Sequence, residues 1–195
     1  MRDVQTEELT QMLLNDKAKF WKAQEVENFL KPFQVDNQKL ITILEFLIED
    51  YIFRWLDFIC LKLPVLATEN NFVNLLKKII LKIMNDMAQH NFIRALISIG
   101  EHDAKLGISL YQQMILNGDP DLIAYSSFPL GGAGKSQFNE VFTLIKEGLE
   151  NQNPNLKAAS IKTLRVIFEG SNKIEKATEI FRLLDTNSSE FVDPS

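Results

Sequence analysis

The chain is poor in the residues that support disulfide, metal or covalent chemistry. Its 195 residues include one cysteine and two histidines. A lone cysteine cannot form an internal disulfide, and Cys60 stands in an apolar run, as expected for a small buried residue in a reducing compartment. His90 and His102 are twelve positions apart, whereas metal ligands cluster at short spacings. We therefore expect no metal site, no cofactor and no catalytic triad.

The sequence also predicts neither a membrane-spanning nor a secretory segment. The most apolar region covers residues 40–67, but charged residues interrupt it, so no run of about 20 uncharged residues remains. The N-terminus carries acidic residues where a signal peptide needs a basic and then an apolar stretch. We expect a cytosolic protein that does not enter a membrane.

Glycine and proline are scarce, at 8 and 6 residues, and fall between runs of helical periodicity. Hydrophobic residues make up 46% and charged residues 24%, which is ordinary for a globular protein and excludes wholesale disorder. The net charge of −5 and the pI near 5.2 disfavour a polyanionic partner. These balances predict an all-α domain.

The N-terminal third is expected to form an irregular bundle of helices, over residues 6–20, 22–30 and 36–63. Asp36 is a suitable cap for the long third helix, and Pro64 is expected to end or bend it. That helix is apolar around most of its circumference. We interpret its aromatic residues, which could also form a stacking platform, as core; they are Tyr51, Trp55 and Phe58.

The middle of the chain contains its clearest helical pattern. Apolar residues between 72 and 87 follow the i, i+3, i+4, i+7 template without a miss. A further helix over 91–99 is expected to end at Gly100, because glycine commonly follows the last turn.

Two segments of the C-terminal half repeat with an offset of 34 residues. Starting at Lys105 and Asn139, they share seven identities over 27 aligned positions. Each unit reads as a helix, a polar turn that closes in proline, and a second helix. Asp119 and Asn153 stand where a helix cap is needed. Their identities are Leu110/Leu144, Asn117/Asn151, Pro120/Pro154, Leu122/Leu156, Ala124/Ala158, Ser126/Ser160 and Leu130/Leu164.

These repeated turns resemble the start of the second helix in HEAT repeats, over about residues 85–185. The segments are Asp119-Pro120-Asp121-Leu122-Ile123-Ala124 and Asn153-Pro154-Asn155-Leu156-Lys157-Ala158. Two features depart from the family. The period is shorter than the usual ~40–47 residues, and the basic residue before the alanine is Lys157 in one copy but Ile123 in the other. Tetratricopeptide repeats share the period of 34, but their Trp, Leu-Gly and Tyr pattern is missing.

The resemblance implies an α-solenoid of HEAT-like helix pairs within a single domain of residues 1–185. Residues 1–66 would supply the N-terminal helices and 68–185 the pairs, with a final helix over 173–184. Residues 186–195 are polar and are expected to form a flexible tail.

Such a fold implies a non-catalytic scaffold that binds a protein partner on the surface made by its second helices. The exposed candidates for partner binding are Asp121, Lys157, Lys162, Arg165 and Glu169. Nucleic-acid binding or base repair is the alternative, because HEAT-like folds include DNA glycosylases. The basic stripe formed by Lys157, Lys162 and Arg165 would suit a phosphate backbone, but the acidic total charge does not. Lys77, Lys78 and Lys82 form another small basic stripe.

The string Gly131-Gly132-Ala133-Gly134-Lys135-Ser136 ends like a phosphate-binding P-loop. That motif needs a glycine where Pro129 stands, and a buried strand before it. We interpret the string as a flexible loop between repeats, with Ser136 capping the next helix, and keep nucleotide binding only as a remote alternative.

Overall fold

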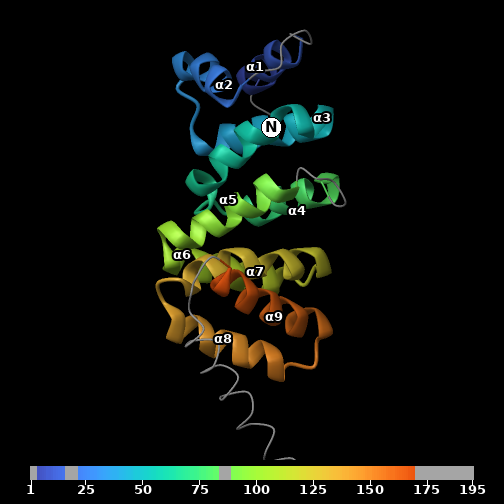
Figure 1. Cartoon of the computed structure of the whole chain (residues 1–195). Coiled ribbons are helices and arrows are strands. Elements are labelled where there is room, and N and C mark those ends of the chain that lie inside the picture. The colour runs from blue at the N-terminus through green and yellow to red at the C-terminus, as the bar shows by residue number, and fades with distance from the viewer. Residues whose placement is uncertain (1–3, 16–21, 84–88, 170–195) are drawn as a thin grey trace, which may run out of the picture.

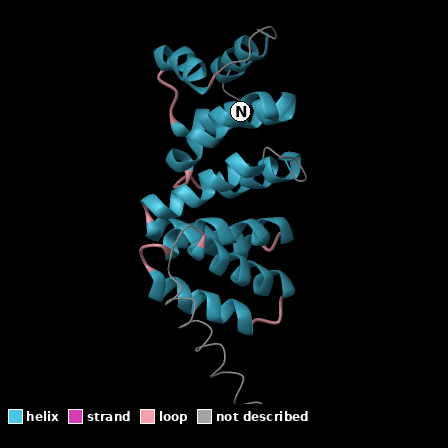
Figure 2. Ribbon diagram, viewed as in Figure 1, coloured by secondary structure: helices cyan, strands magenta, loops and turns pink. Residues whose placement is uncertain are grey.

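The computed structural model of the chain describes residues 4–15, 22–83 and 89–169. All regular structure in these ranges is helical (Figure 2). None of the described helices is both long and apolar enough to cross a membrane. In chain order the elements are α1 (Val4–Asn15), α2 (Ala23–Leu30), the 3₁₀ helix η1 (Lys31–Phe33), α3 (Asn37–Leu66), α4 (Phe72–Ile83), α5 (Gln89–His102), α6 (Ala104–Asn117), α7 (Pro120–Gly134), α8 (Phe138–Glu150) and α9 (Pro154–Phe168).

The helices are stacked in layers that follow the chain from one end of an elongated molecule to the other (Figure 1). Helices α1 and α2 form one end, and α8 and α9 the other. Helix α3 contacts α1, α4 and α5, while α7 makes its most extensive contacts with α5, α6 and α9. A larger apolar core runs from α1 to α7 and includes Val166 of α9, and a smaller one lies among α6, α7, α8 and α9.

Helix α3 begins as expected and ends later than expected. The Asp36 side chain accepts a hydrogen bond from the N–H of Lys39 at 2.8 Å, so the predicted cap is confirmed. Trp55 and Phe58 are each only 1% exposed, which confirms their place in the core. Of the two alternatives predicted for Pro64, the end is wrong, because the helix continues to Leu66, and the bend stays a prediction. Because proline has no N–H, Pro64 leaves the carbonyl of Cys60 without its usual intrahelical donor.

Gly100 does not end a helix, contrary to the sequence prediction. Helix α5 runs on to His102, and Gly100 is buried within it. A Cβ at this position would overlap the backbone carbonyl oxygen of Pro129 in α7. Glycine at this position therefore allows two helix backbones to approach closely and does not form a turn.

The glycine-rich string is also helical. Gly131 to Gly134 form the last turn of α7 and are buried, so the prediction of a flexible loop is wrong. Ser136 does not cap the next helix either. Its hydroxyl donates back to the carbonyl of Ala133, and Gln137 occupies the cap position of α8 without a side-chain bond.

The two repeated turns adopt the local structure that the sequence predicts. Asp119 caps α7 by accepting hydrogen bonds from the N–H groups of Asp121 and Leu122, and Asn153 caps α9 by accepting one from the N–H of Asn155. The helices of the pair α6–α7 begin at 104 and 120, and those of α8–α9 begin at 138 and 154. The predictions for residues 16–20, 84–87, 173–184 and 186–195 lie outside the described residues.

Candidate functional site

Helix α9 is fixed to the molecule by one face. Its start is set by Asn153, whose Oδ1 accepts from the N–H of Asn155 at 2.9 Å. Pro154 takes the first helical position, where no N–H partner is needed. The helix packs against α7 and α8. Its buried residues are Ala159, Ser160, Thr163, Val166 and Ile167.

The opposite face carries two cations and one aliphatic residue in a row. Lys157, Ile161 and Arg165 follow one another at intervals of four residues, and all three are exposed, Ile161 to 61%. Because each residue turns an α-helix by about 100°, this row points away from the buried face. We call Lys157, Ile161 and Arg165 the α9 stripe.

Lys162 lies beside the α9 stripe, on the flank that faces α7. Its Nζ is 4.4 Å from the ring centroid of Phe128 and 5.7 Å from that of Tyr125. The rings of Tyr125 and Phe128 meet edge to face with centroids 5.7 Å apart. Tyr125 also lies 5.8 Å from Phe92 of α5, so an aromatic row links α5 to α7 and Lys162 of α9 joins it. Such a cation–π contact stabilises by about 0.5–1 kcal/mol at an exposed site.

Positive charge is concentrated where α9 meets α7. Burial lowers the pKa of Lys162 below its ordinary value of 10.5, and the nearby charge of Arg165 lowers it further. Burial also raises the pKa of Tyr125, with the Asp121 carboxylate as a second cause. The repulsion between Lys162 and Arg165 means that an anion placed beside them would be stabilised.

Three of the five residues that the sequence proposes for partner binding, Lys157, Lys162 and Arg165, lie on α9, and Glu169 directly follows its last residue. Arg165 Nε donates to Glu169 Oε1 at 2.9 Å. Lys157 has no ion-pair partner among the described residues. Asp121 stands apart, half-buried in the first turn of α7, and within the described ranges no ion pair joins it to the cations of α9.

The other predicted basic stripe, on α4, is neutralised within the fold. Each of its three lysines faces a carboxylate from α3 or from the turn before α7. The ion pairs are Lys77 Nζ–Asp119 Oδ2 at 2.7 Å, Lys78 Nζ–Glu45 Oε1 at 2.9 Å and Lys82 Nζ–Glu49 Oε2 at 3.0 Å. These lysines hold α4 to its neighbours, so they are poorly suited to grip a phosphate backbone.

The P-loop-like string is placed where it cannot cradle phosphate. Its glycines are buried in α7, where the backbone N–H groups bond to carbonyls one turn earlier. A Cβ on Gly132 would overlap the carbonyl oxygen of Ile97 in α5. Lys135 is engaged as well, since its Nζ lies 2.5 Å from Glu101 Oε1. The geometry therefore disfavours nucleotide binding by this string.

The described residues contain no cluster of three or more His, Cys, Asp or Glu side chains that could hold a metal ion. His102 Nδ1 lies 2.8 Å from the backbone oxygen of Ser98, within its own helix. Cys60 is half-buried, and burial raises the pKa of its thiol to about 12. A thiol that stays protonated at neutral pH is a poor nucleophile.

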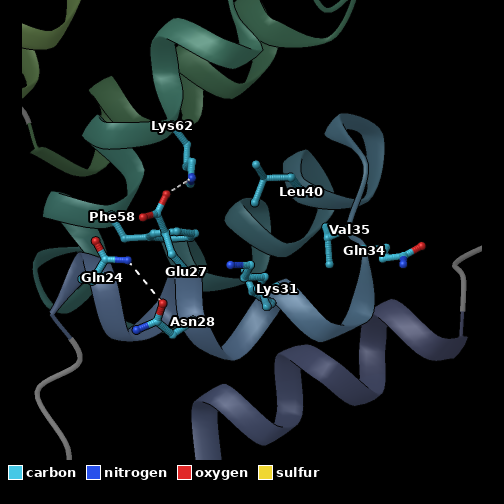
Figure 3. Close-up of a pocket in the computed structure, with 10 residues that line it drawn as sticks. Gln24, Glu27, Asn28, Lys31, Gln34, Val35, Leu40, Phe58 and Lys62 are labelled. Carbon is cyan, nitrogen blue, oxygen red and sulfur yellow. Dashed lines mark hydrogen bonds and ion pairs between the residues drawn. The ribbon is translucent and has the colours of Figure 1, made fainter.

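A cleft of about 390 Å³ lies between α2, η1 and α3 (Figure 3). Its charged and amide side chains are largely engaged with one another. Glu27 forms an ion pair with Lys62, and the Gln24 amide donates to Asn28 Oδ1 at 3.3 Å. The cleft therefore offers few free polar groups that would select a ligand.

The sequence interpretation missed Ile161 and the aromatic pair beneath Lys162. A signal for Ile161 exists, because it stands four residues after Lys157 and four before Arg165. The contact of Lys162 with α7 leaves no such signal, since it depends on the register between two helices.

Comparison with known protein families, with characterised proteins and with solved structures finds no match to the chain.

Proposed function

We propose that the chain is a non-catalytic scaffold or adaptor, built as an α-solenoid of HEAT-like helix pairs, that binds a protein partner through the outer face of α9. The pairs α6–α7 and α8–α9 start 34 residues apart, at 104 and 138, and their second helices lie next to each other. Helix α5 precedes them on the other side of α7. Stacked pairs of this kind bury a continuous core and leave an extended surface for a partner.

One observation carries the proposal, namely the contrast between the cations of α9 and those of α4. The α4 lysines are each paired with a carboxylate of another helix or turn, so their charges serve the fold. Those of α9 are not joined to any other helix by an ion pair in the described chain, and they surround the exposed Ile161. A surface that mixes exposed charge with an apolar centre is typical of a protein interface.

Affinity capture from a native lysate tests the proposal. The tagged full chain and its Lys157→Glu/Arg165→Glu variant would be compared at low and moderate salt, and the recovered material analysed for protein and nucleic acid. We expect a discrete protein partner that survives moderate salt and is lost with the variant. The matched control is Lys31→Glu/Lys105→Glu, which makes the same charge change at two exposed lysines of η1 and α6. If every captured protein is retained by both variants, the α9 face is not the binding surface.

Nucleic-acid binding or base repair is the second candidate function, because Lys157, Lys162 and Arg165 would also suit a phosphate backbone. The apolar residue at the centre of the face and the total charge of −5 favour protein over nucleic acid. Recovery of nucleic acid that falls steeply with salt, without a protein, would support this candidate instead. In either case the proposal includes a cytosolic location, which the single, half-buried thiol of Cys60 supports.

A further inference from the structure

Ile161 is exposed at the place on α9 that contributes least to the fold. Residues 159, 163 and 166 mark the buried face, and steps of about 100° per residue put Ile161 nearly opposite their centre. Single exposed aliphatic residues are common on protein surfaces and need no explanation by themselves. What distinguishes Ile161 is its setting, since a cation lies one turn before it and another one turn after it.

The spacing of the α9 stripe defines what would be complementary to it. With a rise of about 1.5 Å per residue, Lys157, Ile161 and Arg165 are about 6 Å apart along the helix axis. A partner that places a carboxylate, an aliphatic group and a second carboxylate at the same interval would satisfy all three. Lys162 stands on the α7 side of this row, held against Phe128, and forms a cationic flank.

Arg165 already binds a carboxylate within the chain. Its Nε binds the Glu169 carboxylate at 2.9 Å, and the two side chains are 79% and 59% exposed. An exposed ion pair at this spacing adds little to the stability of a helix. A carboxylate from a partner can therefore replace Glu169 at little cost, with Ile161 buried at the same time.

An extended strand could also present alternate residues at nearly the same interval, about 6.6 Å. It would, however, lay its unpaired backbone N–H and C=O groups against a helix, which has no free edge to bond them. A helical partner satisfies its own backbone groups, and so the contact favours an α-helix.

On the basis of the proposed function, we infer that the partner element is an amphipathic acidic α-helix. It places an acidic, an aliphatic and a second acidic side chain, each four residues apart, against Lys157, Ile161 and Arg165. The acidic groups contact the two cations, and the aliphatic side chain covers Ile161. Recognition thus depends on the order and spacing of these residues and not on negative charge alone.

Fluorescence anisotropy with three labelled peptides of equal charge and length tests this inference on the full chain. The first is a helix-forming peptide with the Glu-x-x-x-Leu-x-x-x-Glu order, the second has the same composition with Leu moved to the opposite helical face, and the third alternates Glu and Leu for an extended chain. We expect the first to bind about tenfold more tightly than the others, since half-burying one aliphatic pair is worth about 1–1.5 kcal/mol.

Variants of the chain assign the binding to the α9 stripe. Ile161→Ser should weaken binding of the first peptide about tenfold and Arg165→Ala about threefold, whereas Glu169→Gln should tighten it about twofold by removing a competing carboxylate. The matched controls are Leu116→Ser, at a leucine that is 85% exposed on α6, and Lys105→Ala on the same helix, which should leave binding unchanged.

Equal affinity for the first and second peptides would overturn the inference, as would tighter binding of the third peptide or insensitivity to Ile161→Ser. If these peptides fail while the Lys157→Glu/Arg165→Glu variant still loses a captured protein, the helical partner is rejected and the proposed function stands. If that variant loses no protein, the proposed function itself is rejected.

Discussion

Helices α7 and α9 occupy equivalent places in two helix pairs and begin in the same way. Each has a cap residue followed by proline, Asp119-Pro120 in α7 and Asn153-Pro154 in α9. They differ in their surroundings. Helix α7 is packed against α5, α6, α8 and α9, whereas α9 contacts α7 and α8. The same motif, a cap residue followed by proline, therefore begins both a helix that is enclosed on several sides and a helix that has an exposed face in the described chain.

The last turns of the two helices reflect this difference. The chain has Gly131, Gly132, Ala133 and Gly134 at the end of α7, and at the equivalent positions of α9, 34 residues later, it has Arg165, Val166, Ile167 and Phe168. The small residues of α7 admit neighbours on two sides. A Cβ on Gly131 would overlap Val166 of α9, and one on Gly132 would overlap the backbone of α5.

The positions that face outward on α9 also differ in burial from their equivalents on α7. Ser127 and Phe128 are buried in α7, and their equivalents in α9 are Ile161 and Lys162, which are exposed. Even the shared alanine behaves differently, since Ala124 is half-buried in α7 and Ala158 is exposed in α9. The surface available to a partner is therefore set by the neighbours of a helix and not by its capping motif.

The largest effect is expected from Gly132→Ala in α7. Alanine favours an isolated helix by up to about 1 kcal/mol over glycine. In this position the new methyl meets the carbonyl oxygen of Ile97, a backbone atom that cannot move aside alone. We expect a net loss of about 3 kcal/mol in the free energy of unfolding, measured in urea. The control, Ala158→Val on the exposed face of α9, should change it by less than about 0.5 kcal/mol. A more stable Gly132→Ala protein would show that α5 and α7 do not approach so closely.

The two caps give the next effect. Asp119→Ala removes the cap of α7 and also the partner of Lys77, and should cost about 2 kcal/mol, whereas Asn153→Ala removes a cap alone and should cost about 1 kcal/mol. Urea unfolding of both variants would measure the difference. Equal costs would mean that the ion pair with Lys77 contributes nothing.

Acidification separates the same two caps. The hydrogen bond from Lys77 holds the pKa of Asp119 below its ordinary value of 3.8. A carboxyl with a lowered pKa in the folded state stabilises the protein above its ordinary pKa, and this contribution is lost as the pH falls through the folded value. The cost of Asp119→Ala should therefore shrink below about pH 3.8, while that of Asn153→Ala, at a residue that does not titrate, should stay constant.

Charge reversal on α4 should affect stability, and charge reversal on α9 should affect binding. Lys78→Glu/Lys82→Glu on α4 places glutamates against Glu45 and Glu49, and should lower the free energy of unfolding by about 1–2 kcal/mol without loss of the captured partner. Lys157→Glu/Arg165→Glu on α9 should abolish capture and change stability by less than about 0.5 kcal/mol. If both double variants changed stability alike, the cations of α9 would be part of the fold as those of α4 are.

Structural features with a local cause could be predicted from the sequence, whereas features that depend on tertiary contacts could not. The caps Asp36, Asp119 and Asn153 were predictable, because a short polar side chain bonds the N–H groups two or three residues ahead. The long helices were predictable from apolar periodicity. Gly100 and the glycines of α7 were misread, because glycine normally disfavours helices and only the approach of another backbone explains it there. The α4 ion pairs join residues more than thirty positions apart, and a sequence gives no register between helices.

The smallest expected effect concerns Lys162, which lies on α9 and also contacts α7. Its charge lies on the binding face of α9, yet its ammonium rests on Phe128 of α7. We expect Lys162→Ala to lower the free energy of unfolding by about 0.5–1 kcal/mol, whereas Lys157→Ala should leave it unchanged. A double-mutant cycle with Phe128→Leu should recover about 0.5 kcal/mol of coupling for Lys162 and none for Lys157. Because Lys162 is held by α7, its removal should weaken the acidic helical peptide less than Arg165→Ala does. The opposite order would mean that Lys162 leaves the aromatic ring to meet the partner, and that the α7–α9 contact is itself part of the binding site.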